Sequence, residues 1–376
     1  MICRSRPLVA LLASLLIAAA LCVPALAAWP DVKPSDVTLV MGGDTGFGRY
    51  VEVRTRANGG WRYPVEGIAP LFRQADIAYL NFEEPLTVNR LPCDTCMVLG
   101  SHPDSIAALT CAGIDVVSLA NNHQGDYGAA GVMENIGHLD DAGIAHAGAG
   151  ANYSAAHRAA IVTVKGVRFG FLSYNEVPPV DYAATEDTPG TAWLTAEGMR
   201  RDIINVRDKV DVLVVLPHWG IEYTNQPTDF QVEMAHLAID SGADIVVGNH
   251  PHWVQQYENY RGRPIFYALG NLVFDQMWSQ ETRQGMALEL RFRDRILEQA
   301  FLHPYTIQDY CRPELMSTGD RDYSLVLARA GLKSDRLWFR PQPMFKVWLA
   351  RQFNIPVGAR DGNHPMRKAI ENGSGY

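Results

Sequence analysis

Residue types that bind divalent metals recur in this chain directly after short apolar runs. Five runs show this pattern: Val37–Met41 before Asp44, Ile77–Leu80 before Glu83, Val116–Ala120 before Asn122 and His123, Val212–Leu216 before His218, and Ile245–Val247 before His250 and His252. A mixture of carboxylate, amide and imidazole suits Mn²⁺, Fe or Zn²⁺ better than Ca²⁺, and it lacks the thiolates of a structural zinc site. The recurrence predicts one metal centre.

Each of these residues also has an ordinary explanation when it is taken alone. Asp44 could cap a helix or a turn, and the His-x-His pair could be two exposed imidazoles in a loop. Glu83 and Glu84 are adjacent, so we expect only one of them to point into a site and the other to lie in a solvated loop. His123, with Asp126 three residues later, could be a surface histidine. Five such strand ends together are hard to explain as accidents.

The elements that must position these residues are buried parallel strands. A continuous Val/Ile/Leu run bounded by turn residues is typical of a strand that is covered on both faces. Helix-like segments alternate with the runs, and several of them end at glycine. They are Asp104–Ala112, Gly131–Ala142, Thr195–Lys209 and Asp229–Ser241. The alternation predicts an α/β fold with βαβ units, in which ligands collect at the carboxyl ends of the strands.

Two other regions predict antiparallel pairs. Ala160–Tyr174 has the pattern of a hairpin, and Gln255–Leu269 has a second one that turns at Arg261-Gly262. We expect Met286–Arg291 to continue the second region, which would give a second sheet or an antiparallel half of the first. A two-sheet sandwich flanked by helices fits this pattern best. The main domain is predicted to span residues 34–310, followed by an extension, 311–376, that lacks clear strand periodicity and has a loose tail.

Residues 1–27 are predicted to be a signal peptide. Arg4 and Arg6 precede an apolar stretch, Leu8–Val23, which is followed by the small-residue site Ala25-Leu26-Ala27. We therefore expect export to the periplasm or cell envelope, with membrane contact only if this segment stays uncleaved. In an exported protein a disulfide is the expected use of the remaining cysteines, Cys93, Cys96, Cys111 and Cys311, whose pairing the sequence leaves open.

The charge of the chain argues against nucleic acid as a partner. The chain has 33 Lys and Arg against 41 Asp and Glu, a net charge of −8, and removal of residues 1–27 takes away two arginines and leaves −10. Such an acidic chain is a poor binder of polyanions and of anionic lipid. A local metal site can still attract a phosphate or a carboxylate.

Seven ordered motifs carry a resemblance to a known family. They are Gly43-Asp44, Asn81–Thr87, Ser118–His123, Asp126–Gly128, His218–Tyr223, Gly248–His252 and Tyr267–Asn271. In this order they resemble the motifs of the CapA family, the poly-gamma-glutamate capsule biosynthesis proteins. That family is similar to the calcineurin-like metallophosphoesterases.

The resemblance implies a four-layer αββα sandwich of the metallophosphoesterase type with a metal centre at its strand ends. The implied metal ligands are Asp44, Glu83, Asn122, His218, His250 and His252. His123 would be the acid or leaving-group stabiliser, with Asp126 favouring its charged form. The chain departs from the wider pattern, because Asp44-Thr45-Gly46 lacks the histidine of Asp-x-His and Glu83 stands where Gly-Asp is usual. One or two ions therefore remain open.

The implied chemistry is hydrolysis of a phosphoester, or of an amide in a cell-envelope polymer, by a metal-activated water. Arg49 is either a clamp for the anionic substrate or an ordinary surface arginine. Membrane proteins of capsule synthesis are possible partners. A second function stays open, in which an envelope protein without catalysis binds or transfers an anionic capsule polymer and uses the metal only structurally.

Overall fold

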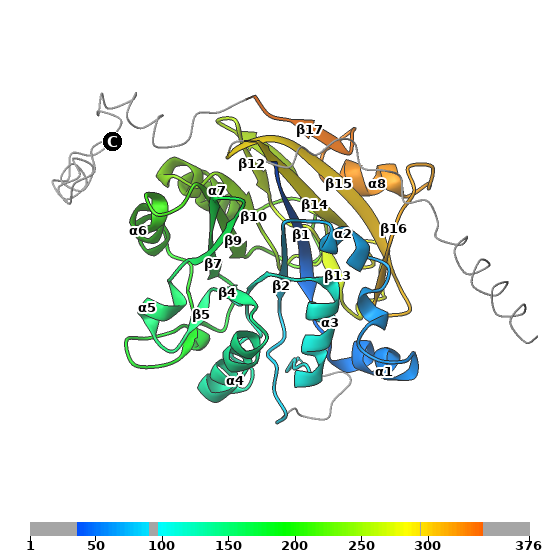
Figure 1. The fold of residues 1–376 in the computed structure, drawn as a ribbon, viewed down its shortest axis with the longest axis horizontal. Helices are drawn as coiled ribbons and strands as arrows, with labels where there is room; N and C mark the ends of the chain where they lie inside the picture. Colours follow the sequence, from blue (N-terminus) through cyan, green and yellow to red (C-terminus); the bar gives the residue numbers. More distant parts are fainter. Residues whose placement is uncertain (1–35, 90–96, 294, 341–376) are drawn as a thin grey trace, which may run out of the picture. The chain divides into compact units, whose positions relative to one another are not determined.

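The computed structural model describes residues 36–89, 97–293 and 295–340, and its helices and strands lie in one compact unit that begins at Val37. Two large sheets dominate this unit (Figure 1). The first has the order β16 (Arg312–Leu315), β15 (Ile296–Gln308), β14 (Gln284–Arg293), β1 (Val37–Thr45), β2 (Ile77–Phe82), β3 (Val116–Ser118) and β4 (Ala145–Ala147). In addition, β13 (Asn271–Val273) pairs with β1, and β17 (Arg336–Trp338) pairs with β15.

The second sheet contains the other two strands that carry site residues. Its order is β11 (Tyr257–Tyr260), β12 (Arg263–Phe266), β10 (Ile245–Val247), β9 (Val212–His218), β7 (Val167–Asn175) and β6 (Ala160–Val164). A small pair, β5 (Ala149–Gly150) and β8 (Gly190–Thr191), lies apart from both sheets. The strands β1, β2 and β3 are mutually parallel, and so are β9 and β10. The carboxyl ends of each parallel set therefore meet at one edge of its sheet.

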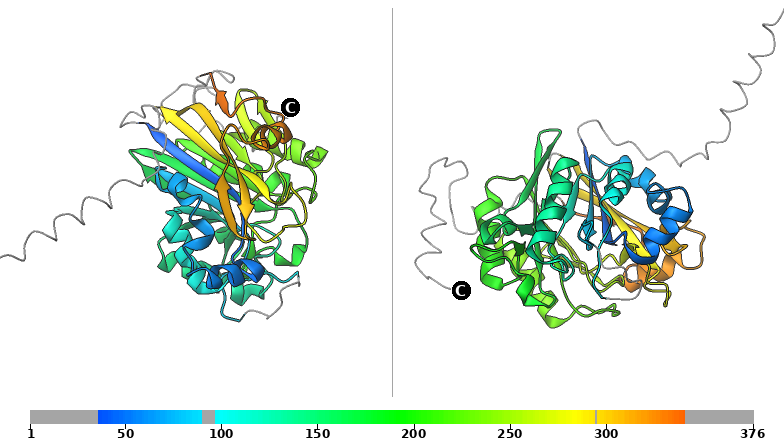
Figure 2. Two further views of the ribbon diagram at one scale, coloured as in Figure 1. Left: turned by 90° about the vertical axis from the view of Figure 1, so that its right-hand side faces the viewer. Right: turned by 90° about the horizontal axis from the view of Figure 1, so that it is seen from below.

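Three hydrophobic cores separate four layers. Alternate residues of β1 show the division, because Leu39 and Met41 pack between the two sheets while Val40 packs against helices. The inner core also contains Phe169 and Val214 of the second sheet. Helices α1 (Arg49–Ala57), α2 (Ala69–Arg73), α3 (Ile106–Ala112) and α4 (Gly128–Asp141) cover the first sheet, and α6 (Ala196–Arg207) and α7 (Asp229–Ser241) cover the second (Figure 2). The predicted αββα sandwich is confirmed.

The shorter elements complete this arrangement. Helix α5 (Tyr153–Ala156) contacts β5 and β8, and α8 (Tyr323–Arg329) packs on β14 and β15. Short 3₁₀ helices at Tyr63–Val65, Pro103–Ser105 and Val180–Tyr182 lie in the connections. No helix in the described part of the chain is long and apolar enough to cross a membrane.

Most of the predicted elements are confirmed, but one strand was given the wrong partner. The four predicted helices appear as α3, α4, α6 and α7, and the hairpins appear as β6–β7 and β11–β12. Met286–Arg291 does not continue the second hairpin, because it belongs to β14, which runs antiparallel to β1 in the first sheet. Its apolar pattern identifies a strand with two covered faces but not its partner, which depends on tertiary packing.

The chain beyond residue 310 is more regular than its sequence indicates. The strands β16 and β17 both pair with β15, so this part completes the edge of the first sheet. The predicted domain boundary stays a prediction. Cys111 and Cys311 are free cysteines. The predicted signal peptide, the loose tail, Cys93 and Cys96 lie outside the described residues.

The end of β1 lies in close backbone contact with Gly270, the residue that precedes β13. Asp44 N–H donates to the carbonyl oxygen of Gly270 at 3.1 Å, and a Cβ placed on Gly43 would lie 1.8 Å from the same oxygen. A side chain at position 43 would therefore have to displace backbone atoms. Glycine at this position lets β1 reach its neighbour and fixes the place of the Asp44 carboxylate.

The substitution Gly43→Ala should therefore lower the free energy of unfolding, by about 1–3 kcal/mol or more, because the methyl group overpacks a backbone contact. Gly137 is the matched control, since it is exposed on α4 and an added Cβ would meet nothing within 4 Å. Gly137→Ala should raise stability by about 0.5–1 kcal/mol. Denaturant unfolding of both variants checks this, and equal stabilities would contradict the close contact at Gly43.

Candidate metal centre

Five strand ends, three from the first sheet and two from the second, bring the predicted ligands together. Asp44 is the eighth residue of β1, Glu83 follows β2, and Asn122 lies in the loop after β3. His218 is the last residue of β9, and the His-x-His pair follows β10. The side chains of these acidic and histidine residues are almost completely buried. The centre is therefore built at the interface of the two sheets.

One group of donors surrounds His252. Asp44, Glu83 and His252 each offer a ligand atom, and the three atoms lie within 4.8 Å of one another. His252 Nδ1 lies 3.2 Å from Asp44 Oδ2, and its Nε2 lies 3.9 Å from Glu83 Oε1. Bonds from a transition metal to nitrogen or oxygen are about 2.0–2.2 Å long, so ligands of one ion lie up to about 4.4 Å apart. The separation of His252 Nε2 and Glu83 Oε1 fits two ligands of one ion, whereas the Nδ1 contact joins His252 to Asp44 directly.

A second group of donors surrounds His218. His218 Nε2 is 2.9 Å from Asn122 Oδ1 and 4.0 Å from Glu83 Oε1. The ring of His250 is 4.9 Å from that of His218 and 5.9 Å from that of His252. Glu83 Oε1 thus lies 3.9 Å from His252 Nε2 and 4.0 Å from His218 Nε2, so this carboxylate could serve an ion held by either group.

Orphaned polar atoms provide a test of whether these residues fit a metal. Among the residues that the structure describes, neither carboxylate oxygen of Glu83 has a hydrogen-bond partner, and the same is true of His250 Nδ1. Glu83 has no exposed surface and His250 is 4% exposed. A buried carboxylate without a partner is costly, and buried charges in proteins are paired or coordinate metals. The donor set therefore fits a divalent transition metal.

The electrostatics of the cluster point the same way. Burial raises the pKa of Glu83 well above its usual range, and the neighbouring Asp44 charge raises it further. Burial also lowers the pKa values of His218 and His250, which favours neutral imidazoles that can bind metal. Burial alone would lower the pKa of His252, but the charge of Glu83 and the contact with Asp44 raise it to about 9. The shifts of His218 and His250 thus favour neutral imidazoles, while His252 is the histidine whose charged form its carboxylate neighbours stabilise.

Two asparagines orient the ligands, a role that the sequence analysis did not assign. Asn81 Nδ2 donates to Asp44 Oδ1 at 2.8 Å, and its own Oδ1 accepts from Ser118 Oγ at 2.7 Å. Asn271 Oδ1 lies 2.8 Å from His252 Nδ1, which leaves His252 Nε2 facing Glu83. Partners of this kind fix the tautomer and direction of a metal ligand. Both residues lie in the recognised motifs, at strand positions next to the ligands.

The backbone that carries the histidine pair is held in an unusual conformation. His250 and His252 have positive φ angles of 96° and 58°. His250 N–H contacts both oxygens of Asp44 at 3.2 and 3.3 Å. Non-glycine residues in this region of φ/ψ space are uncommon and cluster at functional sites. The strained turn directs two imidazoles toward one place.

His123 and Asp126 form a pair beside the metal ligands. His123 Nδ1 is 2.9 Å from Asp126 Oδ2, and both side chains are less than 10% exposed. Asp126 is held in place by Leu99 N–H at 2.7 Å and by the hydroxyl of Tyr182 at 3.2 Å. His123 also contributes to the electrostatic environment of His218 and His250. His123 is therefore buried and oriented, and it is not a surface histidine.

Two predicted residues have structural partners. Only one of the adjacent glutamates faces the centre, as expected, but Glu84 is not solvated. It is 2% exposed, and its Oε2 accepts from Phe47 N–H, Gly48 N–H and the Ser101 hydroxyl. Arg49 forms a largely buried ion pair with Asp275. A role for Arg49 in substrate binding stays a prediction.

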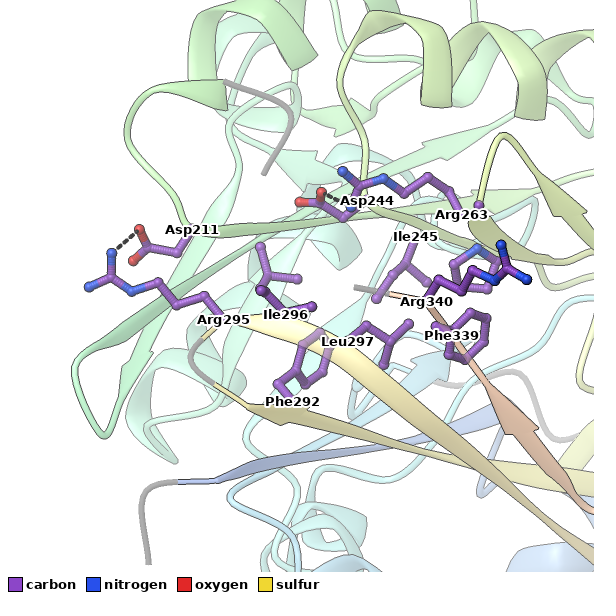
Figure 3. Close-up of a pocket in the computed structure, with 13 residues that line it drawn as sticks. Asp211, Asp244, Ile245, Arg263, Phe292, Arg295, Ile296, Leu297, Phe339 and Arg340 are labelled. Atoms are coloured by element: carbon purple, nitrogen blue, oxygen red, sulfur yellow. Dashed lines mark hydrogen bonds and ion pairs between the residues drawn. The ribbon is translucent and has the colours of Figure 1, made fainter. Parts of the chain in front are cut away.

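A separate pocket lies at the opposite end of the second sheet. It is bordered by Asp211 and Asp244, which precede β9 and β10, and by Arg263 and Arg295 (Figure 3). These charges are paired, since Arg263 Nη1 lies 2.5 Å from Asp244 Oδ1 and Arg295 Nη1 lies 3.4 Å from Asp211 Oδ1. None of the predicted site residues borders it.

Comparison with known sequences decides the family. The sequence model of the bacterial capsule synthesis protein PGA_cap matches residues 38–276. The capsule biosynthesis protein CapA of Bacillus anthracis is 31% identical over 322 residues, which cover 83% of this chain and 78% of that protein. The chain belongs to the PGA_cap family of bacterial capsule synthesis proteins.

Other PGA_cap relatives and more distant structures also match. The PGA biosynthesis protein CapA of Bacillus subtilis is 36% identical, with 67% of this chain and 66% of that protein covered. The 5'-nucleotidase precursor of Thermus thermophilus aligns with a TM-score of 0.45 and 16% identity, covering 74% of this chain and 56% of that one. The NAD nucleotidase of Haemophilus influenzae aligns with a TM-score of 0.45 and 12% identity, covering 85% and 67%.

Replacement of both histidines of the pair, His250→Ala together with His252→Ala, should abolish tight metal binding, because it removes one donor from each group. The matched control is His138→Ala on α4, where the imidazole lies 3.8 Å from Glu134 and borders neither group. Elemental analysis of each purified protein after loading with Mn²⁺ or Zn²⁺ checks this. Full metal content in the double variant would contradict the assignment.

Proposed function

We propose that the protein is a metal-dependent hydrolase that acts on an anionic polymer of the capsule or cell envelope. The observation that carries the proposal is the oriented His123–Asp126 pair beside a buried cluster of metal donors. A metal bound there would lower the pKa of a coordinated water and polarise a scissile phosphoryl or acyl oxygen. The donor set suits Mn²⁺, Fe or Zn²⁺, with one or two ions.

The residues of this chain would divide the remaining work. Asp126 holds Nδ1 of His123, so Nε2 is the nitrogen left to donate a proton to a leaving group. Asn122 Oδ1 lies beside His218 Nε2 and would fix an oxygen ligand in that part of the site. Burial of Asp44, Glu83 and the histidines keeps water from competing with these contacts.

The relatives support a polymeric, anionic substrate. Two carry names that assign them to capsule or PGA biosynthesis, and one of Mycobacterium tuberculosis is named a probable polyglutamine synthesis accessory protein. A cationic metal centre in an otherwise acidic protein is a natural place for a carboxylate or phosphate group. We therefore propose poly-gamma-glutamate or a related envelope polymer as substrate, and the membrane proteins of capsule synthesis as partners.

The substitution His123→Ala should reduce turnover about 10²–10⁴-fold while metal content persists, because it removes the proton donor and no carboxylate ligand. The measurement is hydrolysis of a generic phosphodiester and of a gamma-glutamyl amide, with metal analysis of the same samples. His138→Ala serves again as control. Metal-loaded wild type that turns over neither substrate but retains polyglutamate would instead favour the polymer-binding function.

We also propose that the protein is exported and acts in the periplasm or cell envelope. The support is the arrangement of Arg4, Arg6, the apolar stretch 8–23 and Ala25-Leu26-Ala27. Intact-mass analysis of the protein recovered from cells should show loss of residues 1–27. Retention of the full segment in a membrane fraction would mean an uncleaved anchor, and a full-length cytoplasmic protein would contradict export.

A further inference from the structure

We propose that Glu222 is an additional metal ligand, on the solvent side of the centre. This inference rests on the metal centre of the proposed function and adds a residue to it. Glu222, His250 and His252 each offer a ligand atom, and the three atoms lie within 4.8 Å of one another. The ligand would be a divalent transition metal.

The free nitrogen of His252 lies between two carboxylates. Its Nδ1 is engaged by Asn271 and Asp44, so Nε2 is the nitrogen available to an ion. Nε2 lies 3.8 Å from Glu222 Oε1 and 3.9 Å from Glu83 Oε1. Both separations fall within the limit of about 4.4 Å for two ligands of one ion. A cation at His252 Nε2 would therefore be within reach of Glu222 as well as Glu83.

Backbone contacts place Glu222 at this position. Tyr223, the next residue, has a φ of 60°, and its N–H donates to the carbonyl of Pro251 at 2.9 Å. This bond joins the loop after β9 to the loop that carries the two histidines. Because β9 and β10 are neighbours and the loops that follow them share this hydrogen bond, Glu222 is held close to His252.

Buried polar residues support the same loop from behind. Gly220 N–H donates to Glu176 Oε2 at 3.0 Å, and a Cβ on Gly220 would meet the Gln231 side chain at 2.4 Å. Gln255 Nε2 donates to the carbonyls of Thr224 and Gln226, and Gln255 Oε1 accepts from Gln231 at 2.8 Å. A loop that is fastened on both sides of Glu222 holds its carboxylate in place.

The orphaned atoms of the centre provide an independent indication of a bound cation. Glu83 and His250 are more than nine-tenths buried, and within the described residues both Glu83 oxygens and His250 Nδ1 lack hydrogen-bond partners. Glu222 differs from Asp44 and Glu83 in its exposure, since its side chain is 35% exposed and theirs are 0–1%. Of these three carboxylates, Glu222 would be the donor nearest to solvent.

The test is a calorimetric titration of the metal-free protein with Mn²⁺ and with Zn²⁺. It compares the wild type with Glu222→Gln. The isosteric amide keeps the shape but removes a strong anionic donor. We expect metal affinity to fall about 10–100-fold or more. Glu233→Gln, at an exposed position on α7, is the matched control and should bind metal as wild type does.

A second readout separates a ligand from a nearby charge. The visible absorption spectrum of the Co²⁺-loaded protein depends on the atoms that bind the ion, so it should change in Glu222→Gln and stay unchanged in Glu233→Gln. An unchanged spectrum or wild-type affinity in Glu222→Gln would overturn the assignment of Glu222 alone. Failure of the wild-type protein to bind any of these metals would instead overturn the proposed metal centre. A cooperative denaturant-unfolding transition of each metal-free variant, compared with that of the metal-free wild type, establishes that its fold is intact.

Discussion

The structure depends on the burial of a carboxylate that the described residues leave without a hydrogen-bond partner. Glu83 has no exposed surface, and its two oxygens have no hydrogen-bond donor among the described residues. Isolated burial of such a charge is among the most expensive events in folding. Its neighbour Glu84 shows the alternative, since three donors from the loop after β1 and from Ser101 satisfy one of its oxygens. Two adjacent glutamates therefore have different surroundings, one satisfied by hydrogen bonds from the protein and the other grouped with residues that could hold a metal ion.

The αββα architecture allows this burial without exposing the ligands to bulk water. Each sheet is covered by helices on its outer face and by the other sheet on its inner face, and the acidic and histidine residues at the strand ends are almost completely buried except for Glu222. The ligands come from both sheets, and Asn81 and Asn271 fix their orientation from neighbouring positions on β2 and β13. Asp44 and His218 lie within strands, and the other candidate ligands lie in loops that directly follow strands, so each is positioned by a sheet.

Much of this could be predicted from the sequence, because strand ends in an α/β fold are recognisable and collect ligands. The runs before Asp44, Glu83 and His218 became β1, β2 and β9, and their polar residues converge. The partner of β14 could not be predicted, since two covered faces look the same in either sheet. The expectation that Glu84 is solvated was wrong. The alternation of side chains along an extended chain predicts that Glu83 and Glu84 face opposite sides, but it does not predict that backbone N–H groups lie on the side that Glu84 faces.

The two asparagines that orient ligands, and the additional ligand that we propose, were the hardest residues to find. Asn81, Asn271 and Glu222 all lie in the motifs that carry the family resemblance, but residue type alone does not distinguish an amide that orients a ligand from one that caps a turn. Their roles emerge only from distances to Asp44 and His252. The sequence can thus identify most candidate donors of a centre, while the residues that orient them, and a donor such as Glu222, require the fold.

The convergence of ligands from both sheets has a consequence for the protein as a whole. Asp44 and Glu83 belong to one sheet and the histidines to the other, so an ion between them would act as a cross-link across the inner core. A ligand that binds only the folded chain adds stability that grows by about 1.4 kcal/mol for each tenfold excess over its dissociation constant. The lifetime of the folded protein would then follow the supply of metal in its compartment, and scarcity of the ion would act as a limit on the amount of protein that survives.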